Sequence, residues 1–206
     1  MFTPWRGPDF GDPQAPLGAS RLLVLGESHY SSHHEIGAYE PGMTLDVVQR
    51  LLHGNRETWM RTFDNIASAI AGQPKSQLGR AGVNAIWNQI AFYNYVPVVA
   101  AHTPGVSPSE QHFAMGAQPF DRLIETLEPL AIIVCGYRLW PRFISNHAVG
   151  YTDNLWKPST PFAAIGTSAI PALRMAHPSI GYSPPAWTAL IADLLTKGSA
   201  SSASKT

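Results

Sequence analysis

The sequence RLLVLGESHY, residues 21–30, decides the fold of this chain. Its first five residues, Arg21–Leu25, form an apolar run that is too short for a helix and is closed by Gly26. This pattern predicts a β-strand that is buried on both faces. Glu27 follows at once, so its carboxylate is expected at the carboxyl end of that strand. Ligands of open α/β sheets bind at strand ends of this kind.

Three further runs have the same form and are also predicted to be strands. They are Gln89–Tyr93, followed by Asn94; Ala131–Cys135, followed by Gly136; and Ala172–Ala176, followed by His177-Pro178-Ser179. Apolar residues at helical spacing occur over residues 59–70, 120–127 and 187–194. Buried strands that alternate with helices predict an α/β fold, here a three-layer α/β/α arrangement with a central, mostly parallel four-stranded sheet.

The length of 206 residues fits one domain. We expect this domain to span residues 1–196 and to be followed by a low-complexity tail, residues 197–206. The tail and the Pro- and Gly-rich first 20 residues are both expected to be irregular. Because no apolar stretch reaches the roughly 18 residues of a membrane span and no signal peptide is recognisable, we expect a cytoplasmic monomer without a membrane partner.

Charge and cysteine content narrow the possible functions. Fourteen Lys and Arg residues balance fourteen Asp and Glu residues, which argues against a broad electrostatic surface for nucleic acid and leaves a small local one open. The single cysteine, Cys135, excludes an internal disulfide and a four-cysteine cluster. His29, His33 and His34 match no recognised zinc signature, so no metal or other cofactor is predicted.

In their order and placement, four segments resemble motifs of the uracil-DNA glycosylase superfamily. Gly26–Tyr30 resembles its water-activating loop, Asn94 its base-reading asparagine, and His177–Ser179 its final His-Pro-Ser loop. Leu127-Glu128-Pro129 resembles the lead into the strand that ends at Cys135-Gly136. The resemblance implies a uracil-DNA glycosylase-like fold. It also implies that the protein binds DNA. The expected activity is hydrolysis of the N-glycosidic bond of uracil or another modified or deaminated base in that DNA.

The resemblance also implies roles for individual residues. Bond cleavage builds positive charge on the sugar and negative charge on the base. The catalytic candidates that would stabilise these charges are Glu27 and His177. The target base must be flipped out, read along its edge and stacked on a ring. The candidates for base binding are Ser28, Tyr30, Phe92 and Asn94. The candidates for DNA binding are Ser179 and, as an apolar wedge in the duplex, Ile180 or Tyr182.

Each candidate has a simpler structural interpretation. Glu27 would cap a following helix, Asn94 would be a turn residue, and His177 would be a hydrogen-bonded loop histidine. The rings of Tyr30, Phe92 and Tyr93 would belong to the core. Four basic residues are interpreted as structural or surface charges, with phosphate contact as the alternative: Arg138, Arg142, Lys157 and Arg174.

Two other functions remain open. Members of the glycosylase superfamily carry Asp where this chain has Ser28, so the protein would be a catalytically silent nucleic-acid-binding module if Glu27 does not replace that Asp. The chain is also similar to serine hydrolases that open with Gly-Asp-Ser, with Ser28 as nucleophile and His177 as base. Those enzymes carry an orienting Asp three residues before the histidine, where this chain has Arg174.

Overall fold

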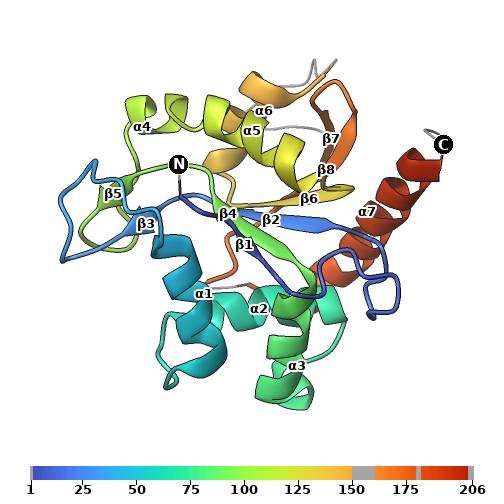
Figure 1. Ribbon diagram of the computed structural model, residues 1–206. Coiled ribbons are helices and arrows are strands. Elements are labelled where there is room, and N and C mark those ends of the chain that lie inside the picture. Colours follow the sequence, from blue (N-terminus) through green and yellow to red (C-terminus); the bar gives the residue numbers. More distant parts are fainter. Residues whose placement is uncertain (1, 150–160, 180–181, 204–206) are drawn as a thin grey trace.

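The computed structural model describes residues 2–149, 161–179 and 182–203, and these form three layers with a β-sheet in the middle (Figure 1). The central sheet of the described residues has six strands in the order β1-β4-β2-β6-β8-β7. Its strands are β1 (Trp5–Arg6), β2 (Leu22–Gly26), β4 (Ala91–Asn94), β6 (Ala131–Cys135), β7 (Phe162–Ile165) and β8 (Ile170–Met175). A separate pair consists of β3 (His29–Tyr30) and β5 (Val99–Ala101).

The four strands predicted from sequence form the parallel centre of the sheet. β2 lies between β4 and β6, and β8 follows β6, with all three of these pairings parallel. Their side chains are buried on both faces, which explains why the sequence reads as apolar runs rather than as alternation. The expectation of an α/β fold with a mostly parallel sheet is therefore confirmed.

The expected strand number of four is wrong. β1 joins the outer side of β4 and β7 joins the outer side of β8, and both added pairings are antiparallel. The sheet therefore has a parallel centre between two antiparallel edges. β1 is only two residues long, and no local pattern marks so short a strand, because its position depends on its pairing with β4.

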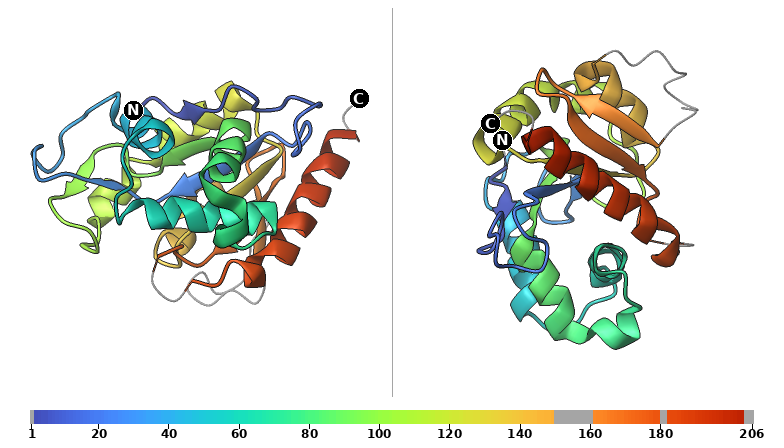
Figure 2. Two further views of the ribbon diagram at one scale, coloured as in Figure 1. Left: turned by 90° about the horizontal axis from the view of Figure 1, so that it is seen from below. Right: turned by 90° about the vertical axis from the view of Figure 1, so that its right-hand side faces the viewer.

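Helices cover both faces of the sheet. They are α1 (Met43–His53), α2 (Met60–Ala71), α3 (Lys75–Gln89), α4 (Glu110–Ala114), α5 (Ala117–Leu127), α6 (Leu139–His147) and α7 (Pro185–Ala203). α4, α5 and α6 lie on one side of the sheet, and α1, α2 and α3 lie on the other (Figure 1). α7 packs beside α2 on this second side, where the Thr188 hydroxyl donates to the Ala69 carbonyl (Figure 2). The three segments with apolar residues at helical spacing, 59–70, 120–127 and 187–194, correspond to α2, α5 and α7.

The expectation of an irregular tail is wrong for residues 197–203, which continue α7. Lys197 forms an ion pair with Asp193 one turn earlier and lies over the Phe162 ring, with its Nζ 4.9 Å from the ring centroid. A Cβ on Gly198 would be 2.5 Å from the Leu130 carbonyl oxygen, so the helix crosses the sheet too closely there for a side chain. The low-complexity residues therefore extend a helix that is already anchored by packing.

The order of the parallel strands reverses next to β2. The chain passes from β2 to β4 on one side and then returns to β6 on the other side. In open α/β sheets such a reversal leaves a crevice outside the carboxyl ends of the two strands involved, here β2 and β6. None of the helices in the described ranges combines the length and the apolarity needed to cross a membrane.

Candidate active site at the carboxyl edge of the sheet

Glu27 lies directly beyond the end of β2, as the sequence predicts. Backbone pairing continues past the strand, because Tyr95 N–H donates to the Gly26 carbonyl at 3.0 Å and Val96 N–H donates to the Glu27 carbonyl at 2.9 Å. The chain then enters β3 rather than a helix, and α1 begins only at Met43. The interpretation of Glu27 as a helix cap is therefore wrong.

The carboxylate of Glu27 pairs with the guanidinium of Arg138. Arg138 Nε donates to Glu27 Oε2 at 2.8 Å, and Arg138 Nη2 donates to Glu27 Oε1. Arg138 immediately precedes α6, close to the end of β6, so this bidentate pair spans the two strand ends at which the strand order reverses. The interpretation of Arg138 as a structural or surface charge agrees with this ion pair, whose partner is the carboxylate of the catalytic candidate Glu27.

His177 follows the end of β8 and faces the same group of charges. Its Nδ1 lies 2.9 Å from Ser179 Oγ. Partial burial lowers the pKa of His177 below its usual value, the charge of Glu27 opposes this change, and the charge of Arg138 adds to it. The ring is therefore neutral near pH 7, although one side of it reaches solvent. The two polar ends expected from sequence thus meet at one edge of the sheet.

Asn65 fixes the loop that carries His177. It lies in α2 with its side chain buried, and its Nδ2 donates to the Pro178 carbonyl at 2.9 Å. Sequence reasoning missed this residue, since an asparagine on an otherwise apolar helical stripe is the only local signal. A buried polar side chain without a partner is costly, so such an asparagine predicts a specific acceptor.

Asn94 is the last residue of β4 and pairs in register with Gly26. Its side chain is only 7% exposed, and no hydrogen bond reaches its amide from the part of the chain that the structure describes. A Cβ on Gly26 would be 2.1 Å from Asn94 Oδ1, so the amide occupies the space that a side chain at position 26 would fill. Asn94 is therefore a largely buried strand residue rather than a turn residue, and its side-chain amide is not paired with another described residue.

The aromatic candidates differ in their surroundings. Tyr30 is 44% exposed, and burial and the charge of Glu27 raise its pKa, whereas the charge of Arg138 lowers it. Phe92 is buried against Phe63 and Trp87 at centroid distances of 5.6 and 5.5 Å. Of these rings, Tyr30 is the one placed to contact a ligand at Glu27, and Phe92 packs in the core as the simpler interpretation expected.

His29 anchors the segment between Glu27 and Tyr30. Its Nε2 lies 2.9 Å from Thr44 Oγ1 of α1, and its ring meets the edge of Phe2 at 4.8 Å. Burial lowers the pKa of His29 to about 3, so it is neutral at any ordinary pH. His29 is therefore a structural residue that fixes β3 against α1.

The remaining candidates take other places. Ser28 forms no side-chain hydrogen bond among the described residues, and His177 pairs with Ser179 instead of with Ser28. The hydroxyl of Tyr182 donates to Met175 Sδ, and its ring stacks on Trp187 at 6.2 Å, so Tyr182 points into the protein. Two candidates lie outside the described residues: Ile180 and Lys157.

Two other basic residues have partners of their own. Arg142 Nε donates to both carboxylate oxygens of Glu110, at 3.1 and 3.0 Å. The Arg174 guanidinium lies over the Tyr137 ring, 5.2 Å from its centroid. The orienting Asp of a serine hydrolase is thus replaced by an arginine that stacks on a tyrosine, and the described residues provide no serine–histidine pair at Ser28.

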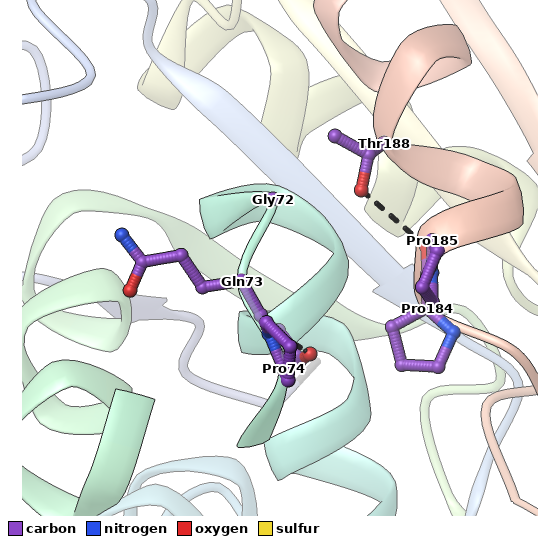
Figure 3. A pocket seen from close by; sticks show the side chains of 7 residues that line it. Gly72, Gln73, Pro74, Pro184, Pro185 and Thr188 are labelled. Carbon is purple, nitrogen blue, oxygen red and sulfur yellow. Dashed lines mark hydrogen bonds between the residues drawn. The ribbon is translucent and has the colours of Figure 1, made fainter. Parts of the chain in front are cut away.

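Two cavities of the described residues are lined by neither Glu27, Asn94 nor His177. One of about 240 Å³ is lined by Ser68, Gly72–Pro74, Pro184, Pro185 and Thr188, between α2 and the start of α7 (Figure 3). The other, of about 820 Å³, lies at the opposite edge of the sheet and includes Arg21, Glu128 and Ile170. Within the described ranges no three His, Cys, Asp or Glu side chains are arranged to hold a metal ion.

Comparison with known proteins adds no assignment to this geometry. No protein-family model matches the sequence, and no curated protein matches it. The function therefore has to be argued from the site itself.

Proposed function

We propose that the protein is a DNA glycosylase that hydrolyses the N-glycosidic bond of a modified or deaminated base. The observation that carries the proposal is that Glu27 and His177, which are 150 residues apart in sequence, lie within electrostatic reach of each other at the carboxyl edge of the sheet. Asn94 adds an unpartnered amide at the neighbouring strand end. The sequence resemblance assigns the same three residues to one reaction.

Each group suits one part of the reaction. The glycosidic bond breaks with its electron pair going to the base, a water oxygen adds to the sugar carbon, and the proton that this water loses balances the proton that the base gains. Glu27 positions this water and offsets the positive charge that develops on the sugar. Asn94 offers an N–H donor and a carbonyl acceptor for the edge of the base, and Tyr30 offers an exposed ring for stacking.

His177 answers the negative charge on the departing base. A neutral imidazole carries one proton, and the hydroxyl of Ser179 can donate to Nδ1 across their 2.9 Å contact. The ring proton then stays on Nε2, which is free to donate to the base. The lowered pKa of His177 favours the neutral imidazole near pH 7. The residue would then donate its hydrogen bond to the base as a neutral group.

A panel of oligonucleotides tests the proposal. Each strand carries one altered base, such as uracil or hypoxanthine, and base release is detected by cleavage of the abasic site in single-turnover reactions. We expect release of at least one base, and Glu27→Gln should slow it about 10²–10⁴-fold. The matched control is Glu110→Gln, which alters the similar arginine pair on α4 and should keep the wild-type rate.

The same panel separates the alternatives. Binding of the strands without any base release would favour a silent nucleic-acid-binding module. Ester hydrolysis together with fluorophosphonate labelling at Ser28 would favour a serine hydrolase. Full base release by Glu27→Gln would show that another group activates the water.

A further inference from the structure

Arg138 has more hydrogen-bonding capacity than Glu27 uses. A guanidinium carries five N–H donors, and two of them are directed at the carboxylate. Among the described residues, Glu27 is the partner of the Arg138 side chain, so its Nη1 has no acceptor there. Hydrogen bonding to Glu27 raises the pKa of Arg138, which keeps the guanidinium fully charged.

The side chains of Glu27 and Arg138 differ in their exposure to solvent. The side chain of Glu27 is 11% exposed, whereas that of Arg138 is 42% exposed. The pair formed by Arg142 and Glu110 is arranged the other way, with the arginine 17% and the glutamate 76% exposed. At the candidate site the cation therefore faces outward and the carboxylate inward, so an anion from solvent meets Arg138 first.

Two exposed tyrosines accompany Arg138. Tyr137, the preceding residue, is 56% exposed, and the Arg174 guanidinium lies over its ring. Tyr30 is 44% exposed and lies close enough for Arg138 to influence its pKa. Gly136, with a φ of +111°, forms the turn that brings Tyr137 and Arg138 to the surface. Exposed rings beside an arginine are the combination with which proteins hold a nucleic-acid strand, since bases stack on the rings and a phosphate pairs with the cation.

We propose that Arg138 is a positioning residue that bridges Glu27 and a backbone phosphate of the bound strand. The planar fork of the guanidinium suits both groups, because it pairs bidentately with a carboxylate and still presents N–H groups to a second anion. Binding of the strand thereby sets the position of Glu27 relative to the target sugar. This inference rests on the proposed function for its substrate, but the phosphate contact can be measured without any chemistry.

The test compares Arg138→Gln, Arg138→Lys and Arg142→Gln with the wild type. Binding of an unmodified single strand is followed by fluorescence anisotropy at several salt concentrations. Loss of one phosphate contact should reduce the slope of log affinity against log salt by about 0.7 in Arg138→Gln. Arg138→Lys keeps the charge and should keep the slope. Arg142→Gln removes the same charge one helical turn later, and it should also keep the slope.

The second measurement is single-turnover base release, with thermal unfolding as a check that each variant is folded. A lysine cannot hold both oxygens of Glu27 as a fork does, so Arg138→Lys should release base about 10²-fold more slowly at saturating DNA. A wild-type salt slope in Arg138→Gln, or absence of strand binding by the wild type, would overturn the phosphate contact. A wild-type rate in Arg138→Lys would overturn the positioning role.

These outcomes are separable from failure of the proposed function. If no oligonucleotide loses a base but the salt slope falls in Arg138→Gln, the glycosylase is refuted and the phosphate contact stands. If base release occurs and the slope is unchanged, the glycosylase stands and the phosphate contact is refuted.

Discussion

The side-chain amide of Asn65 in α2 donates to the carbonyl of Pro178 at 2.9 Å. This contact joins a helix on one face of the sheet to the loop that follows β8, and Pro178 directly follows His177. The loop that carries His177 is thereby fixed from outside, by a residue 113 positions before Pro178 in sequence. Groups that position a functional side chain in this way affect rates strongly without touching the substrate.

Replacement of Asn65 should therefore affect both stability and activity. Asn65→Ala leaves the buried Pro178 carbonyl without a donor, which should cost about 1–3 kcal/mol of unfolding free energy in chemical denaturation. Base release should also slow, because His177 loses its support. Asn84→Ala is the matched control, since Asn84 Nδ2 donates to the Leu52 carbonyl at 3.1 Å far from the site. Equal rate losses in both variants would show that the effect is only one of stability.

Gly26→Ala tests the close contact between the ends of β2 and β4. Its Cβ would be 2.1 Å from Asn94 Oδ1 and 3.3 Å from Phe92 Cζ, so the amide of Asn94 must move. We expect about 1–3 kcal/mol of destabilisation and loss of discrimination between bases, as judged by unfolding and by rates on the oligonucleotide panel. At Gly42 the nearest atom to an added Cβ is 3.8 Å away, so Gly42→Ala should change neither quantity.

Stability should fall in mild acid because of His29. Its pKa is about 3 in the folded protein and near 6.5 in the unfolded chain, so between these values only the unfolded chain takes up the proton. Lowering the pH from 7 to 5 should cost about 2 kcal/mol of unfolding free energy from this residue. His29→Gln should remove most of that loss in denaturant titrations at the two pH values, whereas His53→Gln, at an exposed position of α1, should retain it.

Replacement of Asn94 and replacement of His177 should impair base release in different ways. Asn94→Ala removes edge recognition and should cost about 1–3 kcal/mol of discrimination between a preferred base and its competitors. His177→Ala removes the donor to the departing base and should slow release of every accepted base by a similar factor. Single-turnover kinetics across several altered bases distinguish the two patterns. Uniform losses in both variants would contradict this division of roles.

Much of the fold could be predicted from sequence because its central strands are buried on both faces. The runs 22–25 and 131–135 carry no charged residue, and their short length and following glycine favour a buried strand over a helix. β7 and β1 could not be predicted, since an edge strand is defined by its neighbour. The start of β4 was also misplaced, because Gln89 ends α3 and the strand begins only at Ala91.

Only the part of the candidate site that follows predicted strands could be predicted from sequence. Glu27, Asn94 and His177 follow apolar runs and were found in this way. Asn65 was not found, and Arg138 was named only as a basic residue without its carboxylate partner, because the partners of Arg138 and Asn65 are 111 and 113 residues away in sequence. Contacts between distant segments decide what a polar residue does, and they depend on the packing of helices that local patterns place only approximately.

The placement of the site on β2 and β8 has a consequence during synthesis. The ribosome makes His177 150 residues after Glu27, which at ordinary elongation rates is a delay of roughly 8–30 s. β8, which leads into His177, completes the parallel centre of the sheet by pairing with β6. A nascent or truncated chain that stops before β8 contains the carboxylate and its arginine but not the histidine. The two groups can therefore be present together only after β8 has been made.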